Sequence, residues 1–250
     1  MALKVGASDT RLKGSLMVFG AYMKGLDIYG AVNSFGWVPA LRVNQDGKRF
    51  ADESLSLIDW GTNGNILKQQ RAIYQIVSKD TLDHYVNEGF PDWIGEMPNF
   101  YEELDKVMRN KKGRIFIADS LDELSDKINV NKTQLKATVD QYNGYSKTGV
   151  DLQFGKNAEY LLPVENGPYY AFKYQTGYFA TTDGLDVTTD AQVLDKKGKV
   201  IPGLYAGGGD AGGCNGETYD VSVVPGSQQG WAVNSGRFAA KHAAVYLKQK

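Results

Sequence analysis

The chain has 250 residues, 42% of them hydrophobic, enough for one sizeable core or for a core and a smaller lobe. Its 28 basic and 29 acidic residues nearly cancel and form no long run of one sign, which argues against binding to nucleic acid or to a membrane surface. One cysteine excludes an internal disulfide framework, and two histidines are too few for a zinc site, so no metal is expected. No apolar stretch approaches the roughly 20 residues of a membrane span. Charged residues interrupt the N-terminus where a signal peptide would be apolar, and we expect a cytoplasmic protein.

The first residues, MALKVGASD, are typical of the end of a helix that stops at Gly6. A helix that begins at the initiator methionine without an N-cap indicates that a segment upstream is missing. Further along, ALRVNQDGKRF predicts a hairpin that turns at Asp46-Gly47, a strong turn dipeptide.

The middle of the chain predicts an α+β lobe. Apolar residues have helical spacing over 65–77, 81–87 and 100–108. GRIFIADSLDELSDKI predicts a short strand and then a helix that Ser120 caps, because a glutamate follows three residues later. NKTQLKATVDQYNGY predicts another helix, which stops at Gly144.

After Pro168 the pattern changes to strands, in YYAFKYQTGYFA, GLDVTT and a hairpin that turns near Lys197-Gly198. The chain then predicts a strand, a glycine-rich crossing and a long helix from about Ser227. Glycines let the backbone approach a ligand closely, and a helix start presents free N–H groups and its positive dipole end. Such a site suits a phosphate or a ring that becomes anionic on reduction. The same glycines are equally compatible with simple packing of a helix on a sheet, and no GxGxxG fingerprint followed by an acidic residue occurs in the chain.

Seven segments occur in an order that resembles one flavoprotein superfamily: MALKVGA, RVNQDGKRFADES, LKATVDQYN with TGVDLQFGK, GPYYAF, VLDKKGKVIPGLYAGG and SGRFAAKHAA. This is the superfamily of fumarate reductases and 3-ketosteroid dehydrogenases, and the resemblance covers nearly the whole chain. In that superfamily a dinucleotide-binding half comes first, a cap domain is inserted, and the chain then returns to complete the flavin domain. The resemblance implies that the N-terminal dinucleotide-binding half is missing here.

The implied fold class is α+β, with an inserted α+β cap (substrate) domain and a partial α/β flavin-binding domain. Residues 1–20 would be a residual helix and linker of the flavin domain. Residues 21–165 would form the cap domain, and residues 166–250 the C-terminal portion of the FAD-binding domain. Arg49 and Glu53 are interpreted as a structural pair at the junction of the two domains rather than as catalytic groups.

Three positions depart from the fumarate and urocanate reductases of the superfamily. Leu57 stands where their proton-donating arginine falls after the GKRFxxE segment, and Phe179 or Ala180 replaces their histidine. Tyr219 occupies the place of the arginine that holds the substrate carboxylate. A dicarboxylate substrate would therefore lose charge-assisted hydrogen bonds of roughly 1.5–3 kcal/mol each.

The resemblance to 3-ketosteroid dehydrogenases is greater, because Tyr219 and Gly226 match the tyrosine and glycine that polarise the substrate ketone, with about three extra residues between them. A tyrosine hydroxyl and a backbone N–H together form an oxyanion site for a carbonyl conjugated to the reacting bond. The alternative is that Tyr219 only packs in a turn. Tyr178 is a second candidate, as a proton carrier, and Cys214 is interpreted as a small buried residue rather than a redox group.

The expected cofactor is FAD, with its ring against the glycine run and the start of the final helix, at Gly208, Gly209, Asp210, Ser227, Gln228 and Gln229. The chain alone is expected to bind FAD weakly or not at all, because the adenosine and pyrophosphate contacts belong to the missing half. The predicted function is a fragment of an FAD-dependent oxidoreductase acting on CH–CH groups. It would reduce or dehydrogenate a C–C bond next to a carbonyl by hydride transfer with flavin. One alternative is a separately folded cap domain without flavin or activity, and another is a small-molecule binding module that reuses the cap cleft.

Overall fold

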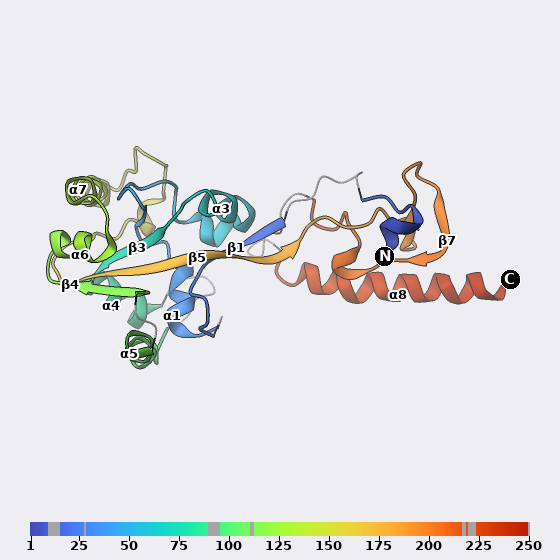
Figure 1. The fold of residues 1–250 in the computed structure, drawn as a ribbon, viewed down its shortest axis with the longest axis horizontal. Helices are drawn as coiled ribbons and strands as arrows, with labels where there is room; N and C mark the ends of the chain where they lie inside the picture. Colours follow the sequence, from blue (N-terminus) through green and yellow to red (C-terminus); the bar gives the residue numbers. More distant parts are fainter. Residues whose placement is uncertain are drawn as a thin grey trace. The chain divides into compact units, whose positions relative to one another are not determined.

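The computed structural model describes residues 1–9, 16–27, 29–89, 96–110, 113–216, 219 and 224–249, without the side chains of residues 16–21 and 178–180. The chain divides into two compact units. The first unit comprises residues 1–19, 58–61 and 178–250, and the second comprises residues 20–57 and 62–177. Helices and strands are mixed, which confirms the α+β prediction (Figure 1). Within the described residues, no helix combines the length and the apolar character that a membrane crossing needs.

The second unit is built on an antiparallel sheet. Its strands follow the order β1-β5-β3-β2, and β4 pairs with β5 as well. Their bounds are β1 Leu16–Tyr22, β2 Arg42–Asn44, β3 Ile73–Ser78, β4 Ile115–Ala118 and β5 Tyr169–Thr181. In the register, Arg42 lies opposite Gln75, and Gln75 lies opposite Phe172. Because opposite residues of antiparallel strands share one face, these three side chains belong to the same side of the sheet.

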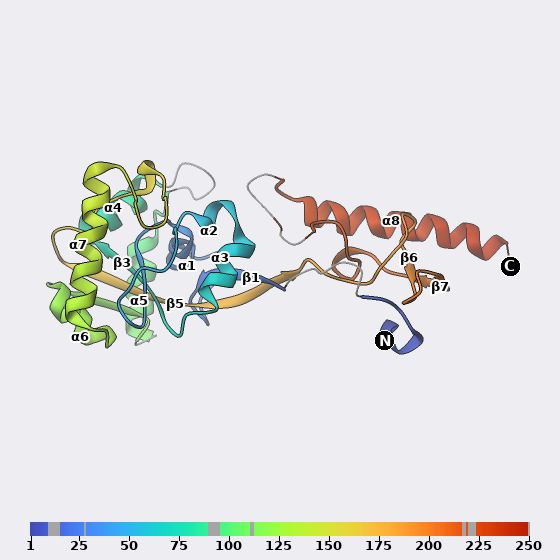
Figure 2. The same ribbon diagram turned by 90° about the horizontal axis from the view of Figure 1, so that it is seen from above.

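Helices α6 (Leu121–Ile128) and α7 (Lys132–Thr148) pack side by side on one face of this sheet (Figure 2). The Ser120 hydroxyl accepts the N–H of Glu123 at 3.1 Å, as the capping pattern predicts. These helices close a core with the sheet that consists of Leu41, Val43, Tyr74, Ile76, Ala118, Leu124, Ile128, Leu135, Val139, Tyr142, Leu161, Val164 and Ala171.

The opposite face of the sheet is covered by an aromatic cluster. The ring of Phe35 lies 5.4 Å from that of Phe100 and 4.9 Å from that of Phe172, and Tyr85 contacts Phe35 edge-on. The elements that bring these rings together are α1 Ala31–Ser34, η2 Phe35–Trp37, α4 Lys79–Glu88 and α5 Phe100–Asn110. The unit also contains α2 Leu55–Ile58, most of α3 Trp60–Leu67, and η3 Ala158–Tyr160.

The first unit holds both ends of the chain. A short 3₁₀ helix, η1 (Ala2–Val5), ends at Gly6 with φ 92°, as predicted. Ser8 then joins the hairpin of β6 and β7, because its N–H donates to the Leu194 carbonyl at 2.9 Å. The remaining elements are β6 Gln192–Leu194, β7 Val200–Tyr205, η4 Gly208–Asp210 and α8 Ser227–Lys248, so the predicted strand, glycine crossing and long helix are confirmed.

Two helix predictions are wrong in part. The helix expected over 65–77 ends at Leu67, and residues 73–78 form strand β3. All six residues of β3 are buried, so the strand lacks the polar–apolar alternation that identifies a half-exposed strand. The helix expected to stop at Gly144 continues to Thr148 and ends at Gly149, which has φ 70°. Gly144 is exposed, and the packing of its helix outweighs the roughly 1 kcal/mol that a glycine costs in a helix interior.

Candidate functional site

The glycine crossing after β7 lies directly on α8. The Gly208 N–H donates to the Ser235 hydroxyl at 2.8 Å, and the indole N–H of Trp231 donates to the Gly208 carbonyl at 3.0 Å. A Cβ on Gly207 would lie 3.1 Å from the Ser235 hydroxyl oxygen. Glycine is therefore required for the crossing to lie this close to the helix.

A second segment, residues 184–187, holds the other side of the crossing. The Leu185 N–H donates to the Asp210 carbonyl at 2.8 Å, and the Gly212 N–H donates to the Leu185 carbonyl at 3.1 Å. A Cβ on Gly184 would come within 2.5 Å of the Gly212 nitrogen, so the two backbones are in direct contact. The crossing is thus fixed between this segment and α8.

An open cleft of about 640 Å³ lies beside the crossing within the first unit. Gly209 and Asp210 line it and are exposed, and a Cβ on Gly209 would meet nothing within 4 Å. Gly208 instead faces α8, since a Cβ there would lie 3.5 Å from Ala232. The other lining residues include Met1, Ala2, Leu3, Asp9, Thr181, Asp183, Gly184, Leu185, Leu204, Tyr205, Ala206 and Gly207. The cleft presents the bare backbone of its glycines, several apolar side chains and three carboxylates, those of Asp9, Asp183 and Asp210.

The start of α8 has no side-chain cap among the described residues. Gly226 is the N-cap with φ 78°, and Gln228 accepts a hydrogen bond from the Asn215 amide. Ser227, Gln228 and Gln229 are not among the residues that line the cleft at Gly209. An uncapped helix start favours an anionic or strongly accepting group.

The predicted catalytic residues fall at the edge of the described region. Tyr219 is buried, with 7% of its surface exposed, whereas Gly226 is exposed. Residues 220–223 between them, and the side chain of Tyr178, lie outside the described residues. Their joint action on a substrate therefore stays a prediction. Cys214 is exposed, so its interpretation as a buried residue is wrong, because the loop turns its side chain outward.

In the second unit, a buried ionic cluster surrounds Arg49. Its guanidinium donates to both carboxylate oxygens of Glu53 at 2.9 Å and forms an ion pair with Asp151 at 2.8 Å. It also lies over the rings of Tyr142 and Phe154, 5.3 and 5.0 Å from their centres. The expected Arg49–Glu53 pair is present, and it belongs to a larger set.

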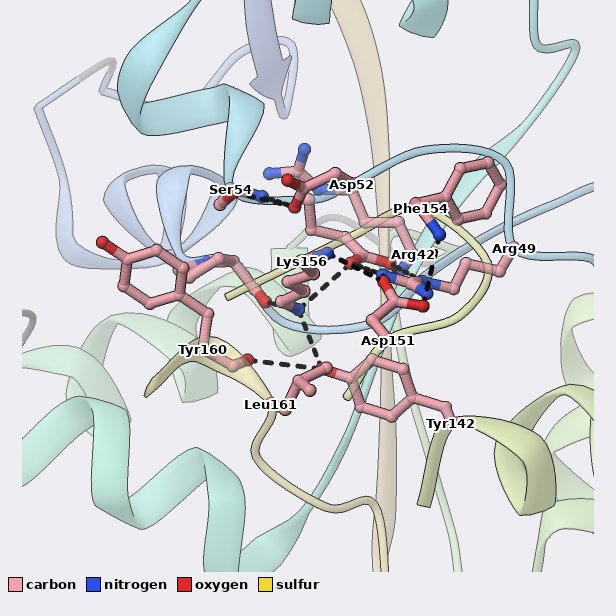
Figure 3. Close-up of polar contacts among 12 residues, drawn as sticks. Arg42, Arg49, Asp52, Ser54, Tyr142, Asp151, Phe154, Lys156, Tyr160 and Leu161 are labelled. Atoms are coloured by element: carbon pink, nitrogen blue, oxygen red, sulfur yellow. Dashed lines mark hydrogen bonds and ion pairs between the residues drawn. The ribbon is translucent and has the colours of Figure 1, made fainter. Parts of the chain in front are cut away.

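Lys156 completes the cluster. Its ammonium donates to Glu53 at 3.1 Å, to the Tyr142 hydroxyl at 2.8 Å and to the Pro39 carbonyl. Figure 3 shows Arg49 and Tyr142 turned toward Asp151 and Lys156, which both come from the segment that follows α7. Two cations thus face two carboxylates in the protein interior, and their charges cancel.

The pKa values of the cluster reflect competition between burial and charge pairing. Burial lowers the pKa of Lys156 to about 8, although attraction to Glu53 opposes this effect. Burial alone would raise the pKa of Asp151, but hydrogen bonds from Arg49 and from backbone N–H groups lower it to about 2. For Glu53, too, Lys156 and Arg49 outweigh burial and lower its pKa. Both carboxylates are therefore ionised at neutral pH.

The cluster anchors the segment that leads into α2. Leu57 of α2, at the position where the resemblance places a proton-donating arginine, is only 1% exposed and belongs to the core. The sequence interpretation missed Asp151 and Tyr142 as partners of Arg49, and Lys156 as a partner of Glu53. Two of them lie in TGVDLQFGK, a segment noted only as a marker of the superfamily, so a signal was present but its partner could not be identified.

The comparison with protein families identifies the family of the chain. The family described as FAD binding domain matches residues 34–219, which is more than half of the chain. The chain belongs to this FAD-binding family. It is a member of the flavoprotein superfamily that contains fumarate reductase-like and ketosteroid dehydrogenase-like oxidoreductases.

Individual relatives are reductases. The chain is 35% identical to the vinyl phenol reductase of Lactiplantibacillus plantarum over 95% of its own length and 50% of that protein. It is 30% identical to the probable fumarate reductase Ifc3 of Shewanella frigidimarina, over 85% of the chain and 32% of that protein. The fold matches a flavocytochrome c3 fumarate reductase with a TM-score of 0.62 at 26% identity, covering 97% of this chain and 39% of the other. The chain therefore spans half or less of the length of these relatives.

Proposed function

We propose that this chain supplies the substrate-side unit and the C-terminal part of the flavin domain of an FAD-dependent reductase that acts on a conjugated C=C bond. The observation that carries the proposal is the cleft at Gly209 and Asp210, which lies in a member of an FAD-binding family whose relatives are C=C reductases. We keep the reverse reaction, dehydrogenation, within the proposal, because the same groups serve both directions.

The residues of the first unit fit FAD. The bare backbone of Gly209 admits a flat ring at close range, and Asp210 can accept hydrogen bonds from hydroxyl groups of the ribityl chain. The Ser227 N–H already donates to the Val224 carbonyl, so the N–H groups of Gln228 and Gln229 would face the edge of the ring that becomes negative on reduction. When bound, the flavin supplies the hydride chemistry, and the protein supplies orientation and polarisation.

The proposed substrate is an uncharged alkene conjugated to an oxygen function. Leu57, in the core, stands at the position of the proton-donating arginine, and Tyr219 at that of the arginine that holds the substrate carboxylate, so a dianion would lack both partners. The Tyr219 hydroxyl and the Gly226 N–H would hold the substrate oxygen and draw electron density from the alkene, which leaves its far carbon electron-poor. Tyr178 would give the proton to the near carbon. A conjugated ketone meets this description.

A dinucleotide-binding half would complete the site. The relatives are at least twice as long as the matched segment. The first unit also exposes several large apolar side chains on η1 and α8. They are Leu3, Val5, Val233, Phe238, Val245 and Leu247. Apolar surface of this extent on one unit indicates a binding face. We propose that the missing half covers it and contributes the adenosine and pyrophosphate contacts.

One alternative from another class is a separately folded cap domain that binds neither flavin nor substrate. The closed core of the second unit, with its own sheet and two helical layers, is the observation that favours it. A third candidate, a small-molecule binding module, requires ligand binding without flavin. The colour of the purified, completed protein separates these functions, because only the first has the visible absorbance of flavin.

The test uses a joined protein in which the part of the L. plantarum vinyl phenol reductase that this chain does not match precedes Met1. Tyr219→Phe in that protein removes one oxyanion donor, and turnover should fall by about 10²–10³-fold with flavin content unchanged. Tyr29→Phe is the control, because Tyr29 is 88% exposed, and it should leave turnover unaltered. Equal turnover in both variants would show that Tyr219 only packs.

A further inference from the structure

Four asparagines of the chain are each followed by a glycine. They are Asn63, Asn143, Asn166 and Asn215. The backbone nitrogen of a following glycine can attack the side-chain amide carbon, because glycine has no Cβ to obstruct the approach. A new carbon–nitrogen bond then forms, the bond to the side-chain nitrogen breaks, ammonia leaves and a succinimide ring remains. Water opens the ring at either carbonyl and gives aspartate or isoaspartate, so the reaction needs no reactant besides water.

The fold protects the two pairs that lie in helices. Ring closure requires the backbone to reorient, and Asn63–Gly64 lies inside α3 and Asn143–Gly144 inside α7, where helical hydrogen bonds hold the backbone. The Asn143 amide is also fixed at both ends. Its Oδ1 accepts the Val164 N–H at 2.8 Å, and its Nδ2 donates to the Val164 carbonyl at 3.0 Å. Asn63 is buried.

The third pair, Asn166–Gly167, lies outside the helices but is held by close packing. Asn166 has φ 57°, in the left-handed region. A Cβ on Gly167 would lie 2.6 Å from the Asp119 carbonyl oxygen, so the two backbones are in direct contact. The carbonyl of Pro168, the next residue, accepts the Lys79 N–H at 2.9 Å. Contacts on both sides therefore oppose reorientation of this pair.

Asn215–Gly216 differs from the other three pairs. It lies in the loop between η4 and α8, where Asn215 is partly exposed and Gly216 is exposed. Apart from the chain neighbours, no described atom lies within 4 Å of a Cβ placed on Gly216. Among the described residues, the Asn215 amide forms one hydrogen bond, as a donor to the side chain of Gln228. Two further glycines, Gly212 and Gly213, precede the pair and add backbone freedom, so this segment can reach the geometry of ring closure.

We propose that Asn215 is a site of spontaneous deamidation through the backbone nitrogen of Gly216, and that the fold protects the other three pairs. Both products carry a carboxylate beside Gln228 in the first turn of α8, where the positive end of the helix dipole attracts a negative charge. The reaction involves only the chain's own atoms and water, and it is independent of the flavin proposal.

Peptide mass spectrometry of the folded 250-residue chain tests this directly. The chain is incubated in mildly alkaline heavy-oxygen water, because the attacking nitrogen must lose its proton. The mass gain of an amide that becomes an acid with one solvent oxygen should appear at Asn215 before it appears at Asn63, Asn143 or Asn166. The control is the same chain unfolded in urea, where all four sites should react at similar rates because each precedes a glycine.

Three outcomes would overturn the proposal. The first is a mass gain in the folded chain that appears earlier at another of the four pairs than at Asn215. The second is an equal rate at all four pairs in the folded chain. The third is an unmodified Asn215 in the folded chain after the time in which the unfolded chain is converted.

Gly216→Ala provides a second measurement. The added methyl group obstructs the attack, and the open surroundings of Gly216 leave space for it, so the mass gain at Asn215 should become much slower. Gly230→Ala is the control, because Gly230 is also exposed and open but lies in α8, away from the attacking nitrogen. It should leave the rate unaltered. Equal rates at Asn215 in the two variants would contradict attack by the Gly216 nitrogen.

Discussion

Two helices, α7 in the second unit and α8 in the first, differ in what they bury. The 17-residue α7 buries Leu135, Thr138, Val139, Tyr142 and Asn143. The 22-residue α8 buries only Ser235 among its described residues. Helical stability in proteins comes mainly from packing of an apolar face, so α7 is stabilised within its own unit and α8 is not stabilised to the same extent. The described residues of the second unit thus bury one face of α7, whereas α8 of the first unit leaves most of its side chains exposed, and we propose that a further part of the protein covers α8.

The largest expected effect comes from the ionic cluster of the second unit. Glu53→Gln removes the charge that Arg49 and Lys156 share; Arg49 keeps its ion pair with Asp151, but Lys156 is left as a buried cation without its carboxylate. The free energy of unfolding of the second unit should fall by about 3–5 kcal/mol in urea titrations. Glu102→Gln is the control, because Glu102 pairs with Lys106 on the surface, and no measurable change is expected. Equal urea concentrations at the unfolding midpoint of the two variants would refute a structural role for the cluster.

The same leucine substitution in each helix tests the comparison itself. Leu135→Ala should destabilise the second unit by about 2–5 kcal/mol, because Leu135 is 0% exposed in its core. Leu247→Ala, at a leucine that is 70% exposed on α8, should change stability by no more than about 0.5 kcal/mol. A large loss for Leu247→Ala in the isolated chain would mean that the first unit packs α8 by itself.

Acid should weaken the second unit through Asp151. Its pKa is about 2 in the folded chain against 3.8 ordinarily, so its contribution is fully present above about pH 4 and is lost as the pH falls toward 2. The shift corresponds to about 2 kcal/mol. Urea unfolding at several acidic pH values should show this slope, and Asp151→Asn should flatten it. An unchanged slope in that variant would assign the acid sensitivity to other groups.

A smaller effect is expected where the glycine crossing contacts α8. Ser235→Ala removes the hydroxyl that accepts the Gly208 N–H, which should cost about 1 kcal/mol and speed amide hydrogen exchange at 208–211. Asn234→Ala, one residue earlier on the exposed side of the helix, is the control and should leave this exchange unaltered. Matching exchange rates in the two variants would show that the hydroxyl does not hold the crossing.

Local signals in the sequence predicted a large part of this fold. These signals depend on residues that are neighbours in the chain, and the predictions made from them agree with the structure. They are the cap at Ser120, the turn at Gly47, and the strand, glycine crossing and helix at the C-terminus. Strand β3 was misassigned because a fully buried strand and a short helix have similar apolar runs. The extent of α7 depended on packing that outweighs the cost of Gly144.

In the ionic cluster, too, a residue could be predicted only where its partner lies close to it in the sequence. Glu53 lies four residues from Arg49, and this spacing allowed the pair to be predicted. Lys156 lies far along the chain and reaches Glu53 only after the sheet and α7 have formed, so its role could not be derived from spacing. The resemblance indicated the family, whereas the contrast between the buried face of α7 and the exposed α8 could be seen only from the burial of each side chain.

Gel filtration with FAD tests the central claim most directly. The account predicts that FAD elutes apart from the 250-residue chain, because the adenosine and pyrophosphate contacts are proposed to belong to the missing half. It also predicts that FAD co-elutes stoichiometrically with the joined protein. Stoichiometric FAD on the 250-residue chain alone, or none on a folded joined protein, would contradict the claim that this chain is the returning part of a flavin enzyme.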